Sequence, residues 1–203
     1  MGSPGPRSAW TSPGLNRASV GMSRLHTRAS LFCRRLATRE EDSVRPLFVI
    51  QPGDFDDDRV KALLTRHLEG MHASSPPGHV FALDWAGLQR PEITLYTLWE
   101  EAELLGFGAL KELDPASGEI KSMRTADAHL RRGVAASLLE HIVDEARKRG
   151  YSRLSLETGS GPAFEPALAL YRRCGFTDGG PFGHYEKSPF NQFLHLALPA
   201  TGP

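Results

Sequence analysis

Leu-Arg-Arg-Gly-Val-Ala-Ala-Ser-Leu-Leu, residues 130–139, places a basic turn with one glycine directly before an amphipathic helix. Apolar residues continue at helical spacing as far as Ala146 and share one face of a helix expected to end near residue 149. The first turn of a helix has N–H groups without intrahelical acceptors and carries the positive end of the helix dipole. Gly133 lets the backbone approach a ligand closely, and Arg131 and Arg132 add positive charge. The sequence therefore predicts a phosphate site at this helix start.

The segments after this helix have a regular order. Gly150 is well placed to end the helix, and residues 153–158 alternate apolar and polar side chains as a short strand does. A loop rich in glycine and proline follows, and Pro166 can open a second helix that Gly175 closes. The pattern predicts helix, strand and helix in succession.

The segments before residue 130 add strands and two further helices. An acidic cluster at residues 54–58 suits the start of a helix whose apolar face runs to Leu68, and residues 70–78 are expected to form a loop. A short helix is expected at 81–88, and strands are expected at 48–51, 92–99, 104–113, 119–125 and 193–198. This order predicts an α/β fold, a mixed sheet with helices on both faces, in one domain over residues 46–200.

The strand at 119–125 departs from strict alternation. Ile120 and Met123 are both apolar but lie three positions apart, so they cannot share a face of a regular strand. A β-bulge between them explains the spacing.

Three segments together resemble the GNAT family of acyl-CoA N-acyltransferases. The family signature, Gln/Arg-x-x-Gly-x-Gly/Ala, is similar to residues 130–135, although Leu130 stands where Gln or Arg is usual. Residues 169–176, Ala-Leu-Tyr-Arg-Arg-Cys-Gly-Phe, look like a C-terminal family segment, and residues 119–125 are similar to its central strand. The resemblance covers roughly residues 48–198 and implies a GNAT-type, central-bulged sheet.

The resemblance implies that acetyl-CoA is the donor. The bulge would splay the central strands and open a slot for the pantetheine arm, which would pair with the backbone of Met123, Arg124 and Thr125. The pyrophosphate would lie on the helix start, formed by Arg131, Arg132, Gly133, Val134, Ala135, Ala136 and Ser137.

Acyl transfer to an amine needs a base for the amine proton and an acid for the departing thiolate. Tyr171 matches the tyrosine of the family motif and is the expected acid, and Glu119 is the first candidate base. Glu157 on the next strand is its rival. His72, in the loop where the family binds its acceptor, is the expected substrate-binding residue. His184 and Tyr185 are weaker candidates for the acceptor end. Each could instead be an ordinary surface or core residue.

The expected activity is N-acetyl transfer to a primary amine of a small molecule. Transfer to a protein or peptide amine, a non-catalytic CoA-binding sensor module, and an interaction protein acting through its N-terminal arm are the alternatives. No Cys/His cluster has metal-ligand spacing, so no metal site is expected. Family members often form dimers, so a homodimer stays open.

The charge balance and the hydropathy of the chain limit the classes of partner that we expect it to bind. The 203 residues contain 24 Lys plus Arg and 24 Asp plus Glu, which gives no net attraction to nucleic acid. No apolar run approaches the ~18 residues that suggest a membrane span. Residues 1–45 form a basic arm, without acidic residues as far as Arg39. The arm is expected to be disordered, an organelle transit peptide, or an upstream extension before Met22. A cytoplasmic location is expected, or a mitochondrial or other organellar one if residues 1–39 are a transit peptide.

Overall fold

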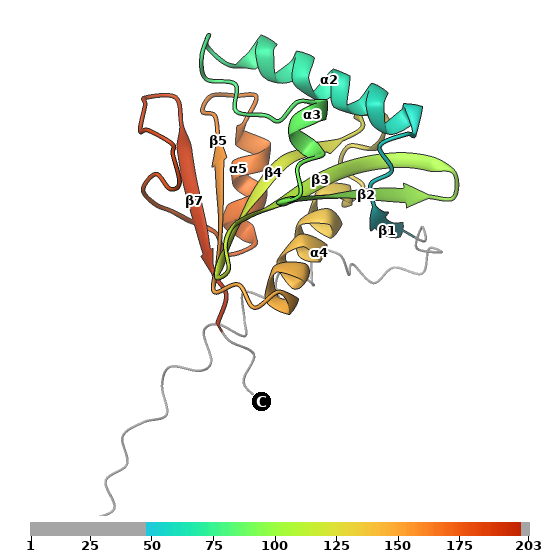
Figure 1. Cartoon of the computed structure of the whole chain (residues 1–203). Helices are drawn as coiled ribbons and strands as arrows, with labels where there is room; N and C mark the ends of the chain where they lie inside the picture. Colours follow the sequence, from blue (N-terminus) through green and yellow to red (C-terminus); the bar gives the residue numbers. More distant parts are fainter. Residues whose placement is uncertain (1–47, 200–203) are drawn as a thin grey trace, which may run out of the picture.

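A computed structural model of the protein describes residues 48–199, which form one mixed sheet with helices packed on it (Figure 1). The arm expected at residues 1–45 lies outside the described residues. The order of strands across the sheet is β1-β2-β3-β4-β5-β7-β6. Only β4 and β5 run parallel, and all other neighbours are antiparallel. The strands are β1 (Phe48–Pro52), β2 (Ile93–Glu100), β3 (Glu103–Asp114), β4 (Ser117–Thr125), β5 (Arg153–Thr158), β6 (Thr177–Asp178) and β7 (Gln192–Ala197).

The helices cover both faces of the sheet, as the sequence predicts. One face carries α2 (Asp58–Ser74) and the short α3 (Trp85–Leu88), and the other carries α4 (Val134–Lys148) and α5 (Glu165–Arg173). Strand alternation supplies both cores, since neighbouring residues of β2 and β3 point to opposite faces. Leu95 and Phe107 pack with α2, whereas Tyr96 and Leu110 pack with α4.

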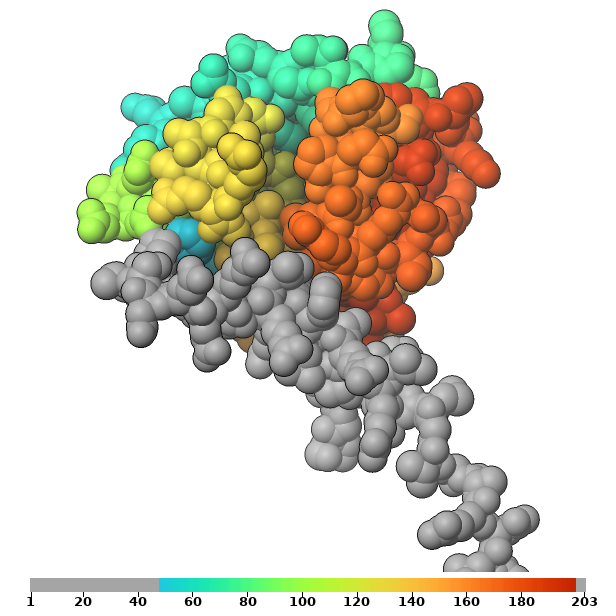
Figure 2. Space-filling model, turned by 180° about the vertical axis from the view of Figure 1, so that it is seen from behind, coloured from blue at the N-terminus to red at the C-terminus, as the bar shows by residue number. Residues whose placement is uncertain are grey.

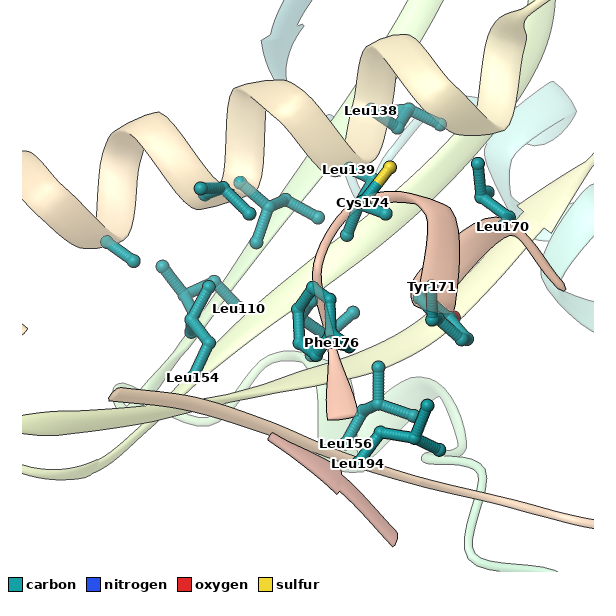
Figure 3. Close-up of a cluster of buried hydrophobic side chains, with 14 of the residues drawn as sticks. Leu110, Leu138, Leu139, Leu154, Leu156, Leu170, Tyr171, Cys174, Phe176 and Leu194 are labelled. Carbon is teal, nitrogen blue, oxygen red and sulfur yellow. The ribbon is translucent and has the colours of Figure 1, made fainter. Parts of the chain in front are cut away.

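The core beneath α4 and α5 fixes the start of α4 relative to β5. Leu138, Leu139 and Ile142 of α4 are fully buried and pack with Leu154 and Leu156 of β5. Figure 3 shows Tyr171 of α5 and Cys174, the residue directly after α5, in the same cluster. Burying each of these leucine side chains contributes roughly 1.5–3 kcal/mol, so this contact holds the two segments firmly.

The bulge expected in the central strand is present. Lys121 of β4 pairs with Ala109 and Arg124 pairs with Phe107, so β4 has one more residue than β3 between these pairs. Ser122 has a left-handed φ of 50°, which few non-glycine residues adopt. Strands β4 and β5 pair only from Ser117 to Glu119 and then separate. The separation leaves the β5-facing edge of β4 without a strand partner from the bulge onward.

The structure corrects the expected loop and the expected second helix. Residues 70–74 continue α2 rather than starting a loop at Gly70, and residues 81–84 precede α3 rather than belonging to it. Strand β6 and a 3-10 turn, η1 (Asp127–His129), have no counterpart among the expected elements. Met71, in this last part of α2, packs against the core beneath α4 and α5, and a Cβ at Gly70 would make only an ordinary contact of 3.6 Å with Arg124 Nη1.

Candidate functional site

The start of α4 is open. Gly133 is the N-cap with a left-handed φ of 88°, and no side chain caps the helix. The first helical hydrogen bond runs from Ser137 N to Gly133 O, so the N–H groups of residues 134–136 have no acceptor within the helix. A Cβ built on Gly133 would meet no heavy atom within 4 Å. The opening can therefore receive an anion at the positive end of the helix dipole.

The two arginines before Gly133 have different surroundings. Arg132 Nη2 lies 2.6 Å from Glu100 Oε2, and Arg132 Nη1 lies 2.9 Å from His129 Nδ1, so this side chain ties the turn to the β2–β3 hairpin. Arg131 is exposed, has a left-handed φ of 62°, and makes no hydrogen bond or ion pair with the described residues. Leu130 is 55% exposed. Arg131 is thus the side chain free to meet an anion.

A pocket runs from the start of α4 along the split between β4 and β5. Its volume is about 460 Å³, within the range of small-molecule sites. Figure 2 shows the molecule hollowed between the yellow segment, which includes the end of β4, and the orange segment of α5, with α2 at the top of the view. Met123, Arg124 and Thr125 line it from β4, and Ala135 lines it from α4. The structure therefore brings four of the ten expected donor-binding residues to one cavity, and the other six, all at the start of α4, lie outside its lining.

Tyr171 of α5 reaches the same cavity at the bulge. Its hydroxyl lies 3.7 Å from Sδ of Met123, and its ring meets Phe176 edge to face at 5.8 Å. Burial raises the pKa of the Tyr171 phenol to about 12. The hydroxyl is therefore protonated at neutral pH and has only a weak sulfur acceptor among the described residues.

The two candidate bases lie on one face of neighbouring strands but in different surroundings. Glu119 is fully buried and outside the cavity lining, and its Oε1 accepts a hydrogen bond of 2.5 Å from the Tyr185 hydroxyl. Lys121 Nζ lies 3.3 Å from the same oxygen. Glu157 lines the cavity and makes no hydrogen bond or ion pair with the described residues.

Burial raises the pKa of Glu157 to about 7, with a smaller opposing effect of Lys121 and a further raising effect of Glu119. The pKa of Tyr185 is raised by burial and by the adjacent carboxylate of Glu119. A carboxyl group that titrates near neutral pH, in contact with a cavity, has the properties of a general base.

The histidines are distributed differently from the sequence expectation. His72 is exposed on α2, its Nδ1 lies 2.7 Å from Leu68 O, and it does not line the cavity. His67 and His79 do line it. Burial lowers the pKa of His67 to about 4, so its ring is neutral. His184 is exposed and stacks on Tyr185 at 5.1 Å.

Lys121, His67 and His79 are cavity residues that sequence reasoning missed. The position of Lys121 could have been found from the sequence, because strand alternation places residues 117, 119 and 121 on one face of β4. No local pattern marks His67 or His79, since their position depends on how α2 crosses the sheet.

Two structural absences hold for residues 48–199. No helix there has the length and apolar character needed to cross a bilayer. No three His, Cys, Asp or Glu side chains in that part of the chain gather closely enough to hold a metal ion.

Comparison with known proteins places this arrangement among acyl-transferring enzymes. The model of the acetyltransferase (GNAT) family matches residues 59–176. The uncharacterised N-acetyltransferase YsnE of Bacillus subtilis strain 168 is 50% identical over 149 residues, 73% of this chain and 99% of that protein. The uncharacterised N-acetyltransferase YedL of Escherichia coli K12 is 45% identical over 152 residues, 75% of this chain and 96% of that protein. The fold is shared by a Bacillus subtilis acetyltransferase solved in complex with CoA, with a TM-score of 0.56 and 21% identity over 74% of this chain and 99% of that chain.

Proposed function

This chain belongs to the GNAT acetyltransferase family, and we propose that it transfers the acetyl group of acetyl-CoA to a primary amine of a small molecule. The observation that carries the proposal is one continuous cavity. It joins the uncapped start of α4, the open edge of β4, the Tyr171 hydroxyl and the Glu157 carboxyl. The CoA complex of the structural neighbour supports a CoA thioester as the donor.

The residues at the start of α4 fit the diphosphate of such a donor. The N–H groups of residues 134–136 lack helical acceptors, and Gly133 leaves the approach clear. Among the described residues, Arg131 is the cation of this turn that has no ion pair. It would supply the polar side chain that the family signature has as Gln or Arg at the position of Leu130. The unpaired edge of β4 at Met123–Thr125 would hold the pantetheine arm as an added strand.

Bound acetyl-CoA supplies an activated acyl group as a thioester. Glu157 accepts a proton from the amine nitrogen, which then bonds to the acyl carbon as the carbon–sulfur bond breaks. The acceptor enters as an ammonium ion, so its nitrogen gives up two protons: one goes to Glu157, which releases it to solvent, and the other goes to the departing sulfur. The products are the N-acetylated amine, free CoA thiol and one proton, so atoms and charge balance. We assign the base to Glu157 instead of Glu119, because Glu157 lines the cavity and has a pKa raised to about 7.

Tyr171 serves the departing sulfur by hydrogen bonding. With its pKa raised to about 12, full transfer of its proton to a thiolate with a pKa of about 8.5 would be uphill. Donation of a hydrogen bond has no such cost, and it stabilises charge as it develops on sulfur. The contact of the Tyr171 hydroxyl with Met123 Sδ, at 3.7 Å, supports sulfur as its partner.

The proposal is tested with purified protein, acetyl-CoA and a panel of small primary amines. Release of free thiol should depend on the amine, and mass spectrometry should find one acetyl group added to the amine for each thiol released. Parallel reactions with longer acyl-CoA donors test the choice of acetyl, since we expect acetyl-CoA to give the highest kcat/KM. If acetyl-CoA binds but no amine is acetylated, the chain is a binding module. Acetylation of peptides alone would exclude the small-molecule acceptor.

A further inference from the structure

The lining of the cavity also includes a group of aromatic rings. His79 and Phe81, from the segment between α2 and α3, have ring centroids 6.4 Å apart. Phe190, before β7, lies 5.7 Å from His79 and 5.5 Å from Phe164. All four rings line the cavity, and we call them the aromatic wall. None of the four comes from the start of α4 or from Met123–Thr125 of β4, the two segments proposed to bind the donor.

Gly159 shows that the aromatic wall is built onto the strand that carries the base. A Cβ at this position would lie 2.5 Å from Phe190 Cζ and 2.7 Å from Phe164 Cζ, closer than real Cβ contacts allow. Only glycine lets both rings rest on the backbone two residues after Glu157. Two rings of the aromatic wall, Phe164 and Phe190, therefore pack on the short segment that also carries Glu157.

The charged side chains that line the cavity can neutralise one ammonium group of an acceptor but no further charged group. Lys121 Nζ already has three partners: Phe81 O at 2.9 Å, the Tyr185 hydroxyl at 2.5 Å and Glu119 Oε1 at 3.3 Å. Because its donors are occupied and its side chain is 9% exposed, it cannot bind an acceptor carboxylate without losing these contacts.

The remaining charged lining residues are paired with each other. Arg124 Nη2 lies 2.7 Å from Asp127 Oδ1, whereas the Nε of Arg124 is buried without a hydrogen-bond partner. Asp127 also meets Arg66, at 3.7 Å. His67 adds no charge, since its pKa is lowered to about 4. Within the described lining, Glu157 is the carboxylate that has no ion pair, so a second ammonium group would find no partner.

We infer that the acceptor is a primary amine carried on an uncharged aromatic or apolar group, with the amine at Glu157 and the apolar group against the aromatic wall. The inference rests on the proposed function. An aromatic guest gains edge-to-face contacts with these rings as well as the burial of its own surface. Polyamines, amino acids with a free carboxylate and charged peptides would each bring an unpaired charge into this cavity.

The acceptor panel tests the inference directly. We expect 2-phenylethylamine to give a kcat/KM at least tenfold above those of spermidine, L-phenylalanine and a lysine-containing peptide. A higher value for any of these three overturns the inference and leaves the proposed function standing. Absence of turnover with every amine, with acetyl-CoA bound, overturns the proposed function itself.

Variants of the aromatic wall separate recognition from general damage. Phe190→Ala should lower kcat/KM for 2-phenylethylamine roughly tenfold, mainly through KM, and should leave the value for ethylamine within about twofold. Phe190→Leu, which keeps the apolar volume, should show a smaller loss. The matched control is Phe55→Ala, because Phe55 packs edge to face on Trp85 at 5.2 Å and does not line the cavity. An equal loss for both amines in folded Phe190→Ala and Phe190→Leu would overturn the inference.

Discussion

The two halves of the cavity are built in different ways. The proposed donor half combines one contiguous stretch, residues 130–137, of which Leu130 and Ala135 line the cavity, with the adjacent edge of β4. The acceptor half is assembled from α2, the segment before α3, two strands and Phe190. A helix start binds phosphate through its own backbone, so the donor half needs little from distant residues. The acceptor half exists only once the chain has folded, and its selectivity can vary without disturbing the donor half.

The largest expected effect is a loss of acetyl-CoA binding when the donor half of the cavity is blocked. Gly133→Glu should abolish detectable acetyl-CoA binding, because the carboxylate would lie at the opening that receives the diphosphate. Calorimetric titration measures the loss. The matched control is Gly150→Glu at the other end of α4, since Gly150 has a similar φ of 78° and equally open space. Both glycines therefore impose similar backbone strain when replaced. Equal binding by the two variants would place the phosphate site elsewhere.

The next effect lies at the acceptor end. Glu157→Gln should lower kcat by about 10²–10⁴ and leave the Kd of acetyl-CoA unchanged, because the lost group accepts the amine proton. Quenched-flow or steady-state thiol release gives kcat, and calorimetry gives Kd. Glu165→Gln, on the exposed first turn of α5, is the control. A coupled loss of binding and turnover would contradict the separation of the two halves.

The same variant should be more stable than the wild type at alkaline pH. The pKa of Glu157 is raised from 4.5 to about 7, so the folded state binds more protons than the unfolded state between these values. Wild-type stability should therefore fall as pH rises through this window, and Glu157→Gln should gain roughly 1–3 kcal/mol at pH 8 but little at pH 4. Urea unfolding at both pH values measures the gain, and a gain that is equal at the two values would argue against this titration.

A smaller effect on rate is expected at the junction of the halves. Tyr171→Phe keeps the buried ring and removes the hydroxyl, so kcat should fall about 10- to 100-fold with little change in acetyl-CoA affinity. Tyr151→Phe is the control, since its hydroxyl bonds Glu112 at 3.0 Å away from the cavity. Unchanged turnover in Tyr171→Phe would remove this residue from the mechanism.

The smallest effect is a displacement of the pH profile. Lys121 lowers the pKa of Glu157 and Glu119 raises it. The acidic limb of kcat should therefore move to higher pH in Lys121→Met and to lower pH in Glu119→Gln, by about half to one unit. Lys148→Met, on the exposed side of α4, should leave the limb in place. Shifts of the same sign in the first two variants would show that the limb does not report Glu157.

The same contrast explains what the sequence could predict. The start of α4 at Val134 and the bulge between Ile120 and Met123 follow from local patterns and are confirmed, and α4 ends at Lys148, one residue before the expected end. The loop expected at 70–78 is partly wrong, because α2 continues to Ser74 and the packing of Met71 against the core outweighs the weak helix propensity of glycine.

The roles of the site residues in the acceptor half, unlike the start of α4, could not be predicted from local sequence patterns. Glu119 and Glu157 look alike in sequence, and only the fold places Lys121 and Tyr185 against the first and the cavity against the second. The expectation for His72 rests on a loop at 70–78, where α2 continues to Ser74, and no sequence pattern singles out His67. Such residues depend on tertiary contacts that no local spacing encodes.

The most direct test is a crystal structure of the protein with acetyl-CoA. The account predicts the diphosphate within hydrogen-bonding distance of the N–H groups of residues 134–136, with the thioester beside the Tyr171 hydroxyl and facing Glu157. A donor bound elsewhere, or one whose thioester lies away from Glu157, would contradict it.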